Sequence, residues 1–290
     1  MDTIEDFLAG WIGGVAGLVI GHPADTIKVR QQSMNEKFFT TIRTTMKYEG
    51  FLGFYKGMMA PFLIIGPSNA VFFSTYGGCL RQLQGNSEAH ERVDLDNPRW
   101  IWNVVIAGAV AGLAQVIITC PAELVKTVLQ THTGRETKWK LHYEAPYNNT
   151  LEAARGIWKK RGIKGFYRGV IPMLYRDVPT SGAYTFVYET LLPRGDNPAL
   201  WKQVIAGGLA GVTSWICTIP FDVIKSRIQS DNPNNPQYKG MIDCFQKSFK
   251  AEGPGVFVKG FWLIIARAFP VNAAVFLGYE YCLALFKSIS

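Results

Sequence analysis

One motif occurs three times in this chain, at intervals of about one hundred residues. It reads PADTIKVRQQ, PAELVKTVLQ and PFDVIKSRIQ, starting at Pro23, Pro121 and Pro220. In each copy an acid follows the proline by two residues, a lysine by five and a glutamine by nine. A second block, EGFLGFYKG, RGIKGFYRG or EGPGVFVKG, follows each copy. Two blocks in register three times predict a tandem triplication with repeats at residues 1–98, 99–197 and 198–290.

Each repeat has the pattern of two hydrophobic helices joined by a polar loop. The first helix runs through the proline motif, and glycines stand thirteen and nine residues before each proline, where they would let helices approach closely. The second helices are predicted near residues 59–83, 170–192 and 258–287, and each is long enough to cross a bilayer, which takes about 20 residues. The predicted fold is an all-α membrane protein with six transmembrane helices, pseudo-threefold symmetry and short helices between them.

Composition agrees with membrane helices that carry polar residues on an inner face. The chain is 48% hydrophobic but only 18% charged, below the quarter or so of charged residues in soluble proteins. Its mean hydropathy of +0.07 is too low for purely apolar helices. The net charge of +8 favours anionic solutes or surfaces. No basic cluster interleaved with surface aromatics indicates nucleic-acid binding.

The sequence gives little support to metal binding, cofactor binding or catalysis. The five cysteines show no CxxC spacing and the four histidines no metal motif, so we expect no disulfide, metal or cofactor. No nucleophile–base set has usable spacing, so no catalytic residue is assigned and we expect no enzyme. The N-terminal MDTIEDFLAG carries acids where a signal or transit peptide needs bases, so any organelle address is expected to be internal.

The charged positions of the triplicated motif share one helix face, because they lie three and four residues apart. Three such helices around a central axis would bring the charges together, since an intramembrane charge must pair or face water. An alternative is that each acid bonds only the lysine of its own helix at a solvated end. The threefold register favours a ring that opens and closes, a gate. Its predicted members are Asp25, Glu123 and Asp222, with Lys28, Lys126 and Lys225, braced by Gln32, Gln130 and Gln229.

With their G-F-Y-K-G-like blocks, the three motifs resemble the signature of the mitochondrial carriers, solute carrier family 25, over nearly the whole chain. The resemblance implies a monomeric six-helix carrier in the mitochondrial inner membrane, with both termini on the cytosolic side and the ring as its matrix gate. It also implies that cardiolipin phosphates bind backbone amides at helix N-termini near Gly57, Gly169 and Gly260, as helix dipoles favour.

Two departures from the family pattern stand out. In the second repeat Val128 replaces the arginine seen as Arg30 and Arg227, and Arg161 replaces the acid seen as Glu49 and Glu252. On the second helices the family usually has an acid after an aromatic and a base three residues later. Here leucines occupy the basic positions and a glycine one acidic position, so we expect a weak cytosolic gate and an empty carrier open to the cytosol. These positions are Gly77, Glu189 and Glu280, with Leu80, Leu192 and Leu283.

A substrate site is expected near the middle of the membrane, where carriers bind their solutes. Three residues before the prolines of the second helices stand Ile64, Arg176 and Arg267. Arg176 precedes Asp177, and such a pair suits a zwitterion, with arginine on a carboxylate and aspartate on an ammonium. An alternative is a structural ion pair between helices. Ile64 and Asp177 both argue against a nucleotide.

RDVPTSGAY, RAFPVNAAVF and Gly21-His22-Pro23 resemble the carnitine/acylcarnitine and ornithine carriers and the less-studied members grouped beside them. We therefore expect transport of basic or methylated amino acids or carnitine-like compounds; a carnitine exchanger proper and a non-transporting scaffold are alternatives. Asn69 would add a polar contact, and His22 would line the cavity or pack between helices. Trp215, Tyr184 and Phe72 would cage a quaternary ammonium by cation–π contact, or simply pack.

Overall fold

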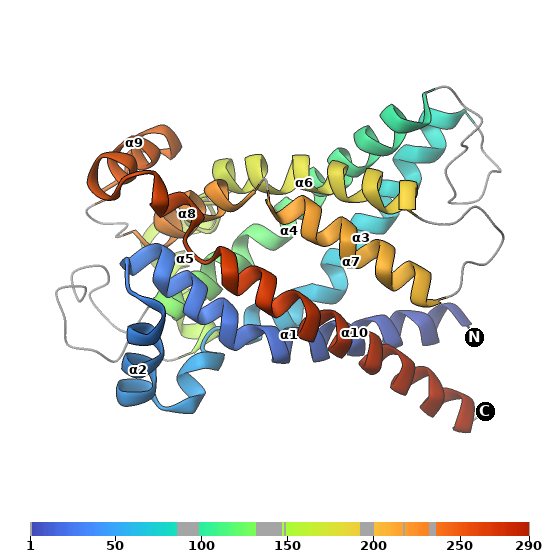
Figure 1. The fold of residues 1–290 in the computed structure, drawn as a ribbon, viewed down its shortest axis with the longest axis horizontal. Coiled ribbons are helices and arrows are strands. Elements are labelled where there is room, and N and C mark those ends of the chain that lie inside the picture. The colour runs from blue at the N-terminus through green and yellow to red at the C-terminus, as the bar shows by residue number, and fades with distance from the viewer. Residues whose placement is uncertain are drawn as a thin grey trace.

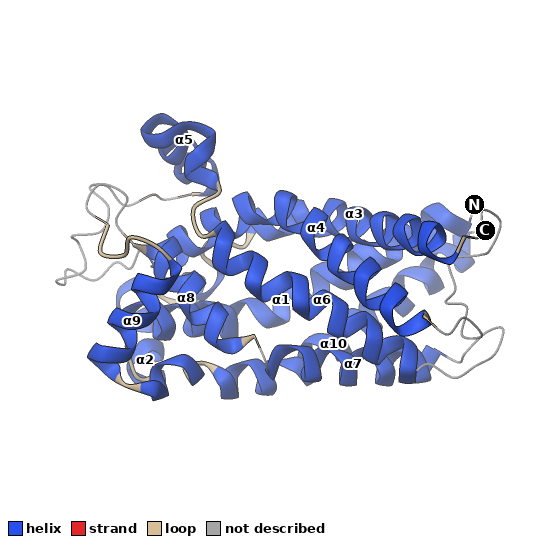
Figure 2. Cartoon of the chain, turned by 90° about the horizontal axis from the view of Figure 1, so that it is seen from above, coloured by secondary structure: helices blue, strands red, loops and turns tan. Residues whose placement is uncertain are grey.

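The computed structural model describes residues 2–85, 99–131, 147, 149–191, 200–216, 218–231 and 236–289. All regular structure in these ranges is helical, which bears out the all-α prediction. The long helices run lengthwise along the molecule and the shorter helices α2, α5 and α9 gather at one end of it (Figures 1 and 2). The start of the first helix and the end of the last lie together at the opposite end.

The long helices fall in pairs, one pair in each repeat. The second helix of each pair lies close to its predicted range, beginning just after a Lys-Gly or Arg-Gly step. Their bounds are α1 Asp2–Met34 and α3 Met59–Gln84 in the first repeat, and α4 Trp100–Thr131 and α6 Val170–Leu191 in the second. In the third repeat the first member is divided into α7 Leu200–Ile216 and α8 Ile219–Ser230, and the second member is α10 Phe261–Ile289.

Short helices connect the two members of each pair. They are α2 Phe38–Glu49 with the 3-10 turn η1 Phe51–Tyr55, α5 Thr150–Phe166, and α9 Met241–Glu252 with η3 Pro254–Val258. The chain bends at Gly50, Gly162 and Gly253, with φ of 68°, 58° and 75°. Only glycine adopts such angles without strain, so the glycine of each EG or RG step sets this bend.

The motif proline has different effects in the three repeats. Pro23 and Pro121 lie inside α1 and α4, which continue past them. In the third repeat two helices meet at the motif, because α7 ends at Ile216 and Pro220 stands in the first turn of α8. Proline lacks the backbone donor of a helix interior but is readily accepted in a first turn.

Small residues allow close helix packing, though not at every predicted glycine. A β-carbon on Gly108 or Gly112 of α4 would collide with Ser181 of α6. In the first repeat the tight contacts of α1 with α10 are at Gly13 and Gly17 instead, and a β-carbon on Gly10 would meet nothing within 4 Å. The glycines of α1 lie on more than one face, so their spacing alone could not tell which face meets a neighbour.

By length and composition, three described segments qualify as membrane spans: Phe51–Gln84, Trp100–Thr131 and Pro254–Tyr279. Six crossings therefore stay a prediction.

Candidate functional site

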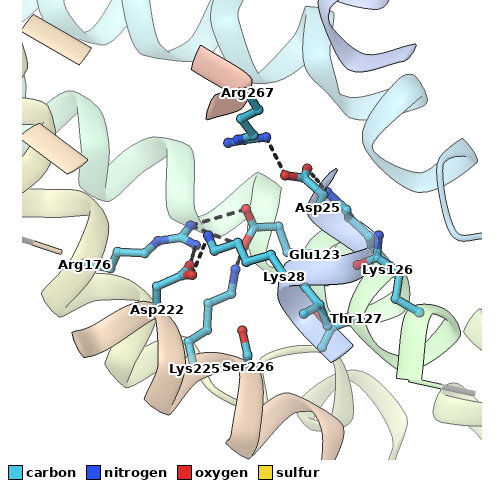
Figure 3. A pocket seen from close by; sticks show the side chains of 12 residues that line it. Asp25, Lys28, Glu123, Lys126, Thr127, Arg176, Asp222, Lys225, Ser226 and Arg267 are labelled. Atoms are coloured by element: carbon cyan, nitrogen blue, oxygen red, sulfur yellow. Dashed lines mark hydrogen bonds and ion pairs between the residues drawn. The ribbon is translucent and has the colours of Figure 1, made fainter. Parts of the chain in front are cut away.

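The charged residues of the triplicated motif come together on the inside of the helix bundle (Figure 3). Each lysine pairs with the acid of a neighbouring repeat. Lys28 Nζ lies 2.6 Å from Asp222 Oδ2, Lys126 Nζ lies 2.7 Å from Asp25 Oδ2, and Lys225 pairs with Glu123. No lysine of the motif pairs with the acid of its own helix in the part of the chain that the structure describes. We call these six residues the ring.

Two arginines of the second helices reach the same acids. Arg176 Nη1 donates to Asp222 Oδ1 at 3.0 Å, and its Nη2 lies 3.3 Å from Glu123 Oε1. Arg267 pairs with Asp25. Each ring acid therefore contacts one lysine and one arginine, with Arg176 serving two acids. The equivalent position of the first repeat holds Ile64, which explains why two arginines serve three acids.

In this conformation the predicted substrate cations Arg176 and Arg267 and the ring form one cluster. Asp177 belongs to it as well, because its Oδ2 accepts from Arg176 Nη2 at 2.9 Å. An arginine side chain is long enough to reach a neighbouring helix, so residue depth along the helix does not fix the depth of its guanidinium.

A cavity of about 90 Å³ lies within this cluster. It holds five cationic side chains against three carboxylates, so it carries an excess of positive charge. A cavity this size admits a few water molecules or a small polar group, and its charge favours a carboxylate or another anionic group. Its lining residues are Asp25, Lys28, Val29, Glu123, Lys126, Thr127, Gln130, Arg176, Asp222, Lys225, Ser226 and Arg267.

The three motif glutamines are buried, but they do not share one role. Gln32 Nε2 donates to Asp222 Oδ2 at 3.1 Å, as expected for a residue that braces the ring. Gln130 Nε2 donates instead to Thr26 Oγ1 at 2.9 Å, and Gln229 Oε1 accepts from Thr127 Oγ1 at 3.1 Å. Among the described residues, Gln32 alone of the three hydrogen-bonds a ring acid, and the other two bond threonine hydroxyls.

His22 packs between helices and does not line the cavity. Its side chain is fully buried, its ring stacks on Tyr55, and its Nε2 lies 3.1 Å from the Lys56 carbonyl oxygen. Of the two alternatives left open for this residue, the structure therefore favours helix packing. Neither Ile64 nor Asn69 lines the cavity, and Asn69 is exposed.

The expected aromatic cage is not assembled among the described side chains. Tyr184 stacks on Tyr188 with ring centroids 6.1 Å apart, and Phe72 stacks on Tyr76 at 6.3 Å. Both are pairs four residues apart on one helix, which is the spacing that brings side chains together. The side chain of Trp215 lies outside the described residues.

At the opposite end of the bundle, the positions expected to form the cytosolic gate show one polar contact among the residues described. Tyr76 donates its hydroxyl to Glu189 at 3.3 Å, while Leu80 is buried against Val104 and Ala107. Leu192 and the side chains of Glu280 and Leu283 lie outside the described residues.

The glycines expected to hold cardiolipin each precede a long helix. Gly57, Gly169 and Gly260 have φ of 83°, 81° and 84°, and each lies against the motif helix of the next repeat. A β-carbon on Gly260 would lie 2.9 Å from Lys28 Cγ, so a side chain would strain the backbone and crowd the ring. This geometry explains the glycines without a lipid, and cardiolipin binding stays a prediction.

Beyond the ring, a second set of polar contacts was not predicted from the sequence; we call it the outer network. In the first repeat Arg30 donates to Thr45 Oγ1 at 2.5 Å and to Glu49 Oε2 at 2.9 Å. Its Nε also donates to the carbonyl oxygen of Gln130 at 2.8 Å, which joins it to the second repeat. The recurrence of arginine, hydroxyl and acid in two repeats was the signal that could have revealed it.

The third repeat has the same network. Arg227 Nη1 donates to Ser248 Oγ at 2.9 Å, its Nη2 lies 2.6 Å from Glu252 Oε1, and its Nε donates to the Gln32 carbonyl oxygen at 3.0 Å. In the second repeat Val128 and Ile157 occupy the equivalent arginine and hydroxyl positions, buried in one apolar cluster. There Arg168 instead bonds Asp231 of the third repeat at 2.9 Å.

Comparison with known proteins agrees with this arrangement. The chain matches the family described as mitochondrial carrier protein over residues 1–87, 97–193 and 196–290. It is 42% identical to solute carrier family 25 member 45 of Mus musculus, over 98% of this chain and 99% of the relative. It is 38% identical to the mitochondrial basic amino acids transporter of Rattus norvegicus, over 93% and 86%.

These matches confirm the family resemblance drawn from the repeated motifs, and they indicate a transporter, not an enzyme. The described residues contain no group of three or more His, Cys, Asp or Glu side chains that could hold a metal. With the triplicated motif, the interlocked ring and a match across all three repeats, this chain belongs to the mitochondrial carrier family, whose members are multi-pass transporters of small solutes in the mitochondrial inner membrane.

Proposed function

We propose that this carrier transports zwitterionic or cationic amino-acid-like solutes, such as basic or methylated amino acids and carnitine-like compounds. The observation that carries the proposal is the position of Arg176 and Arg267, both of which line the ring cavity. A carboxylate entering the cavity would find two guanidinium groups, the donors that bind it best in a bidentate geometry. The name of the rat relative, a basic amino acids transporter, supports the same solute class.

The second charge of the solute is assigned to Asp177. A carboxylate that takes up Arg176 leaves Asp177 without its present partner, and an ammonium group can then replace the guanidinium beside it. A monocarboxylate would satisfy the arginines but leave this aspartate uncompensated. A nucleotide would bring several negative charges toward the same aspartate, so its binding would be opposed.

The ring acids and the substrate would compete for Arg176 and Arg267, and this competition gives a basis for alternating access. In the closed ring Arg176 stabilises Asp222 and Glu123, and Arg267 stabilises Asp25. A substrate carboxylate competes for both guanidinium groups, and each acid then retains only its lysine. The solute thus weakens the closed ring as it binds, which favours opening on that side. Only this differential interaction can shift the balance between two conformations.

We also propose the orientation in the membrane that the family resemblance implies. The ring lies on the matrix side, the six long segments cross the inner membrane, and both termini lie on the cytosolic side. We place cardiolipin phosphates at the helix starts that follow Gly57, Gly169 and Gly260, where helix dipoles favour anions. The carrier works as a monomer, because a single chain supplies all members of the ring.

Uptake by purified protein in liposomes tests the assignment. The panel comprises lysine, arginine, their methylated forms, carnitine derivatives, a monocarboxylate, a dicarboxylate and a nucleotide. Asp177→Asn should weaken uptake of cationic and zwitterionic solutes about tenfold or more, since a charge-assisted bond contributes roughly 1.5–3 kcal/mol. Asp243→Asn, at an acid of α9 outside the cavity, is the matched control. Transport of nucleotides or dicarboxylates, with no uptake of any basic or carnitine-like compound, would contradict the proposal.

A further inference from the structure

The second repeat carries a group of cations that the other two repeats lack. It lies where α5 bends at Gly162, the position at which the first and third repeats place the acid of the outer network. We call this group the basic corner. Its members are Lys160, Arg161 and Lys164, whose equivalents are Tyr48, Glu49 and Leu52 in the first repeat and Ala251, Glu252 and Gly255 in the third.

The charges of Arg161 and Lys164 are not neutralised as the equivalent acids are in the other repeats. Glu49 pairs with Lys56 and with Arg30, and Glu252 pairs in the same way with Lys259 and Arg227. Arg161 and Lys164 are exposed, and neither forms an ion pair with another described residue. The exchange of an acid for Arg161 therefore leaves a cationic surface where the other repeats have compensated charge.

A small cavity opens between this corner and α4. Its volume is about 20 Å³, room for about one water-sized group. Its lining combines apolar side chains with the cations Lys160, Arg161 and Arg168, so one oxygen atom of a bound anion fits there beside positive charge. The lining residues are Leu124, Tyr147, Ile157, Lys160, Arg161, Gly165 and Arg168.

We propose that the basic corner binds a phosphate group, carried by a lipid headgroup or by a soluble phosphate compound. An exposed arginine offers a planar pair of donors that matches phosphate oxygens, and nearby lysines add charge without demanding a fixed geometry. Arg168 is held by Asp231 at 2.9 Å and shapes the rim. The site is separate from the ring and borders the helix start after Gly169 through Arg168, and its set of cations is present in the second repeat only.

The test uses the purified full-length protein in a detergent of zero net charge. Its thermal unfolding is followed while inorganic phosphate, or in a second arm a water-soluble short-chain phosphatidic acid, is titrated. Because both side chains are exposed, Arg161→Gln/Lys164→Gln should fold as the wild type does. Its apparent Kd for the bound probe should be about tenfold weaker or more, since charge-assisted bonds are lost. The matched control, Arg43→Gln/Lys47→Gln, removes the same charge from α2.

The control should bind as the wild type does. Stabilisation by phosphatidic acid alone that weakens in the Arg161→Gln/Lys164→Gln variant would support a lipid headgroup as the source, and stabilisation by both probes that weakens in this variant would support a site open to soluble phosphate as well. Stabilisation that is unchanged in the variant would overturn the proposal, because the probe would then bind elsewhere. A wild-type protein that neither probe stabilises would overturn the proposal. Equal weakening in the variant and the control would overturn it too, because binding would then follow total surface charge. Ring residues are untouched, so the result does not depend on the transported solute.

Discussion

The ring and the outer network are two sets of charged contacts in the same bundle. The ring involves all three repeats, whereas the outer network is present in two of them. The ring keeps one acid–lysine pair between every two repeats. The outer network is present in the first and third repeats, where Arg30 and Arg227 each bond a hydroxyl and an acid. In the second repeat its three positions are Val128, Ile157 and Arg161.

The difference shows which layer depends on all three repeats. A ring pair joins two repeats, so losing one partner leaves a charge in the neighbouring repeat without its lysine. The Arg–hydroxyl–acid set lies mostly within one repeat, so it can be exchanged as a unit. Replacing a buried ion pair by packed apolar residues is often neutral or stabilising, whereas removing one partner is costly. In the second repeat all three positions differ from those of the other repeats, so neither an arginine nor an acid of the set is left without the other.

The largest effect is expected in the ring. Lys28→Ala, Lys126→Ala and Lys225→Ala should each lower liposome uptake by roughly a hundredfold or more, because removing one partner of a buried ion pair costs on the order of 3–5 kcal/mol and leaves the acid with its arginine alone. Exchanging the partners, as in Asp25→Lys/Lys126→Asp, should restore part of the activity. If all three single variants transported like the wild type, the closed ring would have no part in the cycle.

Loss of one outer-network arginine should reduce stability more than a truncation in the second repeat. Arg227→Ala leaves Glu252 without its buried partner and should lower the free energy of unfolding by about 3–5 kcal/mol. Val128→Ala removes only two methyl groups from an apolar site and should cost roughly 1.5 kcal/mol. Thermal and denaturant unfolding in detergent would measure both, and equal losses would contradict the comparison.

A graft of the second-repeat residues into the third repeat sharpens the comparison. Arg227→Val/Ser248→Ile/Glu252→Arg should recover most of the stability that Arg227→Ala loses, leaving a deficit of about 1–2 kcal/mol. Part of this deficit arises because the Gln32 carbonyl oxygen loses the donor Arg227. The measurement is again unfolding. A triple variant less stable than Arg227→Ala would show that the second repeat relies on other compensation, such as Arg168 with Asp231.

The smallest expected effect is on pH dependence. Burial favours the neutral form of Glu252, but hydrogen bonds from Lys259 and Arg227 outweigh it and hold the pKa of this carboxyl below its ordinary value. A depressed pKa in the folded state stabilises the protein above the unfolded pKa, near 4.3, and this contribution is lost as the pH falls through the folded value. Wild type and Glu252→Gln should therefore differ in melting temperature at pH 7, and the difference should shrink as the pH falls below the unfolded pKa and through the lower folded pKa. A difference that stays constant with pH would contradict this.

The sequence predicted the helical architecture because its signals are local and repeated. The starts of α3 and α6 follow from the Lys-Gly and Arg-Gly steps, and the bends at Gly50, Gly162 and Gly253 follow from the EG and RG steps. The acid–lysine contacts of the ring were also predictable, because the same charged helix face occurs in all three repeats and the three faces meet at a common axis. The repeat boundaries at 98 and 197 stay predictions.

The sequence alone thus determined the triplication, the helix pairs, the residues of the ring and, through their combination, the family. Only the tertiary structure decided that Arg176 and Arg267 contact the ring acids, that His22 packs on Tyr55, and that Arg30 and Arg227 organise an outer network. The physical reason is the length of the side chains. Local sequence patterns determine the backbone conformation and the helix face on which a residue lies. Where a long or aromatic side chain ends depends on the partners that neighbouring helices offer it.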